Sequence, residues 1–111
     1  MNKASKNNAI LMDNFVPSEF YLSQNYPNPF KDKTSIKYCL SERTKVELTI
    51  FNSNGEKVKN LFSKVQNAGT YKTIFNGQNF SAGVYYYQLK AMPVGRQAGK
   101  YVETRKMVHI K

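Results

Sequence analysis

Residues that could perform catalysis or bind a metal are few in this chain, which has one histidine, one cysteine and seven acids among its 111 residues. A serine-type triad needs a histidine held between a nucleophile and an acid, so it would have to combine His109 with Asp13 or Asp32. We expect Asp13 in an N-terminal arm and Asp32 in a corner loop, away from the terminal segment that carries His109. The other acids are scattered, and no pair has a spacing that suggests acid–base catalysis on a glycoside. The sequence therefore predicts no catalytic residues, no metal site and no cofactor.

Cys39 and His109 are expected to have structural roles. A single cysteine excludes an internal disulfide and a cysteine-based zinc site. No base adjoins Cys39 in the sequence to activate its thiol, so we predict a small, buried or half-buried strand side chain. We predict that His109 is a half-exposed strand side chain. Gly95 and Gly99 lie in an expected hairpin, not between a strand and a helix, so they do not form a phosphate-binding loop.

The aromatic run Tyr85-Tyr86-Tyr87 could stack on a sugar or on single-stranded nucleic acid. Successive side chains of a strand point to opposite faces, so we expect Tyr85 and Tyr87 in the core and Tyr86 outside. An exposed Tyr86, with Phe80 in a loop, is what a carbohydrate-binding or adhesion module would offer. That module is the alternative function.

The chain is strongly basic, with a formal net charge of +10. Residues 90–111 contain six Lys or Arg and a single acid, Glu103. Such a balance favours acidic partners such as nucleic acid, phosphorylated lipid or an acidic protein surface, although a charged surface also serves solubility alone. Binding to nucleic acid from charge alone would weaken steeply with added salt, and we do not predict nucleic acid as a partner.

Short alternating segments separated by turns predict an all-β protein. Segments 34–40, 45–51, 57–62, 70–75, 84–91 and 101–111 carry most of the expected strands. About seven strands with polar turns are typical of an antiparallel immunoglobulin-like β-sandwich. The residues expected to face the core include Ile36, Tyr38, Leu40, Val46, Leu48, Ile50, Tyr71, Thr73, Phe75, Tyr85, Tyr87 and Leu89.

The N-terminal residues 1–19 are polar and show no period, so we expect a disordered linker or arm there. A single β-sandwich domain is expected over residues 20–111. Within it, the prolines of the segment 25–30 exclude helix, and we expect a rigid corner that Tyr26 and Phe30 pin to the core. Residues 93–99 are expected to form a flexible hairpin loop.

Several motifs then follow one another in a familiar order. The first is Leu22-Ser23-Gln24-Asn25-Tyr26-Pro27-Asn28-Pro29-Phe30, and later ones lie at 34–38, 46–51, 54–58, 68–71, 81–87 and 105–111. Together they span about residues 20–111 and resemble the type A C-terminal sorting domains of the Bacteroidetes-type type IX secretion system. The family-motif residues are Pro27, Asn28, Pro29, Gly69, Gly83, Tyr85 and Tyr87. The longer loop at 92–100 and His109, where an apolar residue is usual, depart from the family pattern.

The resemblance implies a non-catalytic address on an exported cargo protein. The cargo would lie upstream, enter the periplasm with its own signal peptide and reach the cell surface or the medium. The implied partners are the secretion machinery at the outer membrane and a sortase-like peptidase that removes the domain. The chain itself shows no signal peptide and no apolar run of the ~18 residues that a transmembrane segment needs, so we interpret it as a detached tail.

The terminal strand is the expected recognition element. Fixed basic groups steer a domain toward an acidic receptor and hold its register there. The strand runs to the last residue, and we expect its edge to add to a partner sheet. The residues predicted to be read are Thr104, Arg105, Lys106, Met107 and Lys111.

Overall fold

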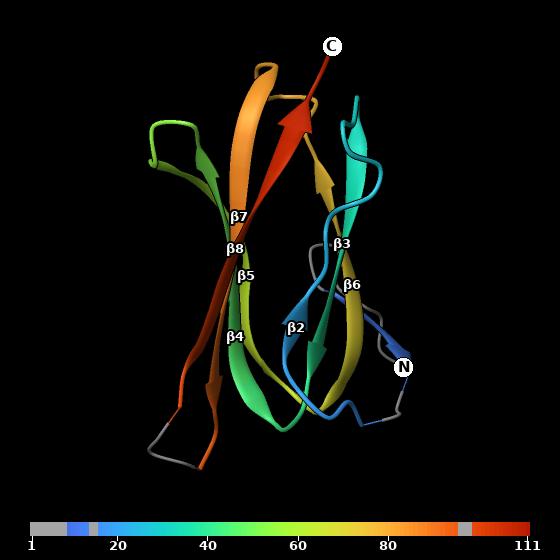
Figure 1. Ribbon diagram of the computed structural model, residues 1–111, viewed down its shortest axis with the longest axis vertical. Helices are drawn as coiled ribbons and strands as arrows, with labels where there is room; N and C mark the ends of the chain where they lie inside the picture. Colours follow the sequence, from blue (N-terminus) through green and yellow to red (C-terminus); the bar gives the residue numbers. More distant parts are fainter. Residues whose placement is uncertain (1–8, 14–15, 96–98) are drawn as a thin grey trace.

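The protein is an all-β sandwich, seen in a computed structural model that describes residues 9–13, 16–95 and 99–111 (Figure 1). Within these residues there are eight strands and no helix. The strands are β1 (Ile10–Asp13), β2 (Tyr21–Leu22), β3 (Lys33–Leu40), β4 (Thr44–Asn52), β5 (Lys57–Gln66), β6 (Gly69–Asn76), β7 (Gly83–Pro93) and β8 (Tyr101–His109). The predicted sandwich is confirmed, with eight strands in place of about seven.

Two four-stranded antiparallel sheets form the layers. The first sheet has the order β1-β6-β3-β2 and the second has the order β5-β4-β7-β8. The chain crosses between sheets at each of the connections β3–β4, β5–β6 and β6–β7, which is compatible with an immunoglobulin-like topology. β5 and β8 are the two edges of the second sheet. The strand predicted to be read by a partner is therefore an edge strand.

The core between the sheets contains the side chains that alternation predicts. Every residue expected there has a relative exposure of 7% or less. Leu22, Phe30, Phe62 and Met107 complete the cluster. Tyr85 and Tyr87 lie in this core, whereas Tyr86 is half-buried on the outer face of the second sheet. This arrangement is the one predicted from the period of two in β7, and only one tyrosine of the run faces outward, too few for a stacking platform.

Two glycines of the family motif begin strands with a backbone that other residues rarely adopt. Gly69 opens β6 with φ 153° and Gly83 opens β7 with φ 150°. A β-carbon in this region of φ is strained. These positions thus explain why the motif places glycine at the entry of both strands.

The arm expected over residues 1–19 contains regular structure, which corrects part of that expectation. Residues 10–13 form β1, antiparallel to β6, with Ile10 opposite Lys72. The open edge of β6 offers backbone donors and acceptors that an extended segment can satisfy, and polar composition alone does not reveal such a partner. The domain boundary at residue 20 remains a prediction.

Two side chains differ from their expected positions. Tyr26 does not pin the corner to the core, since it is 78% exposed and only its backbone pairs, with Ser35. Phe30 is buried as predicted. His109 is 4% exposed, where a half-exposed side chain was expected. Of the expected flexible loop at 93–99, residues 96–98 lie outside the described residues.

Candidate functional site

The terminal strand β8 carries most of the residues predicted to be recognised, and the structure separates them into two groups. Thr104, Lys106 and Lys111 are exposed. Arg105 is half-buried, and Met107 is fully buried in the core. Met107 cannot touch a partner without unfolding the domain, and Arg105 offers only part of its side chain.

Arg105 ties β8 to the start of the domain. Its Nε donates to the carbonyl oxygen of Leu22 at 2.7 Å, and its guanidinium lies 6.0 Å from the ring centroid of Tyr21 and 3.5 Å from a carboxylate oxygen of Glu103. A charge-assisted bond to a backbone carbonyl is stronger than a neutral one. Arg105 therefore acts first as a link between the two sheets.

Residues 24–30, which we call the capping segment, cover the outer edge of β8 at its C-terminal half. Phe30 N–H donates to Val108 O at 2.9 Å, and Ile110 N–H donates to Phe30 O at 2.8 Å. Gln24 Nε2 donates to Lys106 O at 2.7 Å, and Val108 N–H donates to Asn28 Oδ1 at 2.9 Å. From the carbonyl of Lys106 to the N–H of Ile110, the backbone groups that face away from β7 thus have hydrogen-bond partners.

The N-terminal half of the same edge is open. In an antiparallel strand both backbone groups of a residue point to the same side, and the side alternates along the chain. The backbone N–H and C=O of Val108 point away from β7, so those of Thr104 and Val102 do as well. Neither has an outward backbone partner among the described residues. This short stretch can accept an added strand, whereas the half under the capping segment cannot.

Buried hydrogen bonds hold the capping segment in place. Asn25 is 2% exposed, and its Nδ2 donates to Pro27 O at 3.1 Å and to Thr34 Oγ1 at 2.9 Å. The Tyr87 hydroxyl donates to Ser23 O at 2.6 Å. The peptide bonds before Pro27 and Pro29 are both cis. Because prolines have no N–H, the segment runs between two sheets without leaving donors unpaired at these positions.

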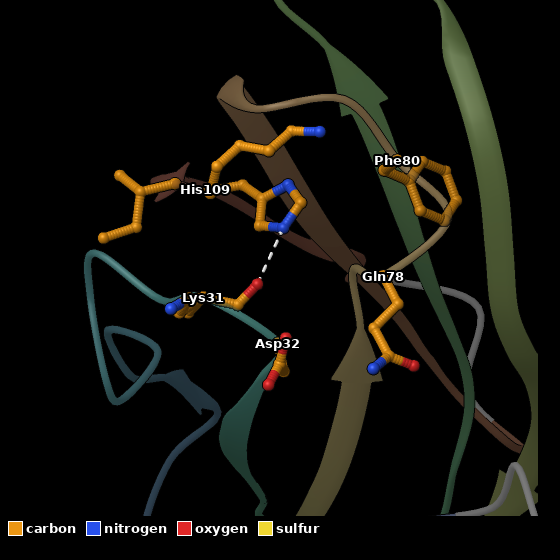
Figure 2. Close-up of a pocket in the computed structure, with 7 residues that line it drawn as sticks. Lys31, Asp32, Gln78, Phe80 and His109 are labelled. Carbon is orange, nitrogen blue, oxygen red and sulfur yellow. Dashed lines mark hydrogen bonds between the residues drawn. The ribbon is translucent and has the colours of Figure 1, made fainter.

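His109 anchors the end of β8 under the capping segment, beside a cavity of about 160 Å³ (Figure 2). Its Nε2 lies 2.9 Å from Lys31 O and its Nδ1 lies 3.1 Å from Ser81 O. Its ring stacks on Phe30 with centroids 4.9 Å apart. Gly77 leaves room for this pair, since a β-carbon there would lie 2.9 Å from the Phe30 ring. Both ring nitrogens face carbonyl oxygens, which can only accept, so a neutral imidazole donates to one of the two. The backbone on both sides of the ring leaves the imidazole poorly placed for metal binding or proton transfer.

The other groups considered for chemistry are also in structural positions. Cys39 is half-buried, as predicted, with Sγ 3.5 Å from Thr70 Oγ1. Among the described residues no cluster of three or more His, Cys, Asp or Glu could hold a metal, and no helix is long and apolar enough to span a membrane. Phe80 packs against Phe75 and Tyr85, with centroids 5.3 and 6.1 Å apart. It therefore does not extend an aromatic binding surface around Tyr86.

Burial changes the acidity of two tyrosines, Tyr87 on β7 and Tyr101 at the start of β8. It raises the pKa of Tyr87 to about 12, and Arg105 offsets part of that effect. It also raises the pKa of Tyr101, as does a hydrogen bond of 2.7 Å to Glu103. These hydroxyls remain neutral donors at any pH below their ordinary range.

Sequence reasoning did not identify the side chains that close the edge. Asn28 is a family-motif residue, but otherwise Gln24, Asn25 and Asn28 stand out only as amides near prolines, a pattern that marks a turn without naming its partners. Their long-range partners lie 9 to 82 residues away along the chain. The available signal is the presence of three amides in a segment whose prolines leave few backbone donors.

The comparison with known proteins agrees with this geometry. The family model for the secretion system C-terminal sorting domain matches residues 24–108, a span that begins in the capping segment and ends where it closes on β8. No curated protein and no solved structure matched the chain. The chain therefore belongs to the family of secretion-system C-terminal sorting domains, the signals that direct cargo proteins through the type IX secretion system.

Proposed function

We propose that the secretion machinery at the outer membrane reads this domain at the open half of β8. A sorting domain implies a type IX secretion system and a cargo protein that is secreted or held at the cell surface. The observation that supports the proposal is the contrast along one strand: the outward groups of Val102 and Thr104 are open, while those from Lys106 O onward are covered.

Side chains on the same strand supply charge. Thr104 and Lys106 project from the outer face of β8, and Lys111 lies exposed beyond its end. Lysines at fixed positions steer an acidic receptor into register, and a receptor strand added at Val102 and Thr104 supplies backbone bonds. Arg105 and Met107 then contribute indirectly, because they hold β8 in the sandwich.

We further propose that the domain is not an enzyme and that a sortase-like peptidase acts on it after transport. Support for the first statement comes from the described side chains. The single imidazole has both nitrogens facing backbone carbonyl oxygens, and Cys39 Sγ lies within hydrogen-bond distance of Thr70 Oγ1. The domain unit is proposed to span residues 20–111, with cargo upstream of residue 1.

The proposal is tested with the full chain fused behind an exported reporter in cells that have a type IX system. The double substitution K106E/K111E is compared with K57E/K59E, which changes the net charge equally on exposed lysines of β5. We expect at least about a tenfold loss of surface delivery for the first pair, because reversing charge in an interface opposes encounter, and little loss for the second. Equal losses would contradict the proposal. Deleting the last six residues is a poorer test, because it removes Met107 and His109 from the core.

A further inference from the structure

The outer face of the first sheet carries lysines that form no ion pair with any side chain the structure describes. Lys37 lies between buried Ile36 and Tyr38 on β3, and Lys72 lies between buried Tyr71 and Thr73 on β6. Alternation therefore sends both lysines to the outer face. The sheet register places them directly opposite each other.

Two like charges at directly opposite positions destabilise a sheet. Neither Lys37 nor Lys72 has an ion-pair partner among the described side chains. Lys33, exposed like Lys37, adds a third lysine to this outer face, whereas Lys72 is half-buried. Asp13 is opposite Thr70, one row beyond the lysine pair. The fold thus retains a repulsive pair that contributes nothing to its own stability.

On the second sheet, by contrast, two outward residues at directly opposite positions carry opposite charges. There the register places Glu47 of β4 opposite Lys90 of β7, a pair of opposite charges that stabilises the sheet. Both residues lie at outward positions between buried neighbours. The lack of such a pair on the first sheet is therefore a local property of that face and not a general consequence of the net charge.

Apolar and aromatic side chains surround the lysine pair. Ile10 is opposite Lys72 and is 56% exposed. Ile74 is 46% exposed in the next row, opposite Ser35, and Ser35 pairs in turn with Tyr26, which is 78% exposed. Lysine, tyrosine and exposed isoleucine together are typical of surfaces that lie at a lipid interface.

We propose that this face, formed by Ile10, Tyr26, Lys33, Lys37, Lys72 and Ile74, docks on the surface of an anionic lipid membrane. Anionic headgroups neutralise the opposed lysines, as they do for basic segments beside membranes. The two isoleucines and the tyrosine enter the interface. Charge complementarity and the exposed apolar side chains beside the lysines favour a membrane over an acidic protein. The inference goes beyond sorting and does not depend on β8.

The test measures binding of the full chain to vesicles of phosphatidylcholine with phosphatidylglycerol and to vesicles of phosphatidylcholine alone. We expect binding only to the anionic vesicles, and about a tenfold or greater loss in Lys37→Glu, since each basic group near such a surface contributes substantially. Lys59→Glu on β5, with the same change in charge, is the matched control and should lose about threefold or less. Lys37→Glu should also melt at or above the wild-type temperature, because it creates an opposite-charge pair with Lys72.

A third variant separates a membrane from an acidic protein as the occupant. Ile74→Ser should weaken vesicle binding about threefold through lost apolar contact, and it should leave binding to soluble polyglutamate unchanged. Three results would overturn the proposal: no binding to anionic vesicles, equal losses in Lys37→Glu and Lys59→Glu, or Ile74→Ser binding vesicles as well as wild type does. None of them bears on delivery by the secretion system, which is measured separately.

Discussion

Along the outer edge of β8, the half from Lys106 to Ile110 is closed by the capping segment, while the half with Val102 and Thr104 is open. The two halves belong to one strand and pair with the same neighbour, β7. An open edge is a template for any strand that meets it. The capping segment therefore leaves only a few backbone groups of this edge unpaired, so an added strand can pair with β8 in a defined register.

The largest expected effect comes from removing the anchor of the closed half. Phe30 is 1% exposed and stacks on His109, so Phe30→Ala should lower the free energy of unfolding by about 3–5 kcal/mol. Urea denaturation followed by circular dichroism measures the change. The control is Tyr26→Ala in the same segment, whose side chain is 78% exposed and which should change stability by less than about 0.5 kcal/mol. Similar losses in both variants would show that Phe30 does not anchor the segment.

A smaller effect is expected where β7 meets Ser23, the residue just before the capping segment. Tyr87→Phe removes the hydrogen bond to Ser23 O and should cost about 1–2 kcal/mol near neutral pH. Burial raises the pKa of Tyr87 from 10.0 to about 12. Its contribution to stability is therefore complete below pH 10 and is lost as the pH rises through about 12, because the unfolded chain releases the proton first.

Denaturation of both proteins across the alkaline range measures that contribution. The wild-type protein should lose stability between pH 10 and 12, and Tyr87→Phe should show a shallower decline over the same interval. Parallel declines would mean that this tyrosine does not set the alkaline limit.

The smallest expected effect sharpens the boundary between the two halves. Asn28→Ala frees Val108 N–H and should cost about 0.5–1 kcal/mol. Amide hydrogen exchange should be slow at Val108 and fast at Thr104 in the wild type, and Asn28→Ala should bring Val108 closer to Thr104. Slow exchange at Thr104 in the isolated wild-type domain would show that its half of the edge is not open.

Strands and their buried faces followed from the sequence, because alternation along β3, β4, β6 and β7 is a local property. Long-range partners did not follow. The burial of His109 depends on Phe30 and Gly77, and β1 depends on an edge of β6 that no local pattern displays. Likewise, Met107 belongs to a recognisable motif, but its burial follows only from the neighbours that the folded structure brings around it.

The account rests on the open half of β8, and one substitution pair tests it directly. Thr104→Pro removes the outward N–H while an edge position tolerates proline, and Thr104→Ala keeps the N–H. Thermal melting first establishes that both variants are folded. When each is fused to the same exported reporter, surface delivery should fail for Thr104→Pro and persist for Thr104→Ala. Normal delivery of a folded Thr104→Pro fusion would contradict the claim that the machinery pairs with this edge.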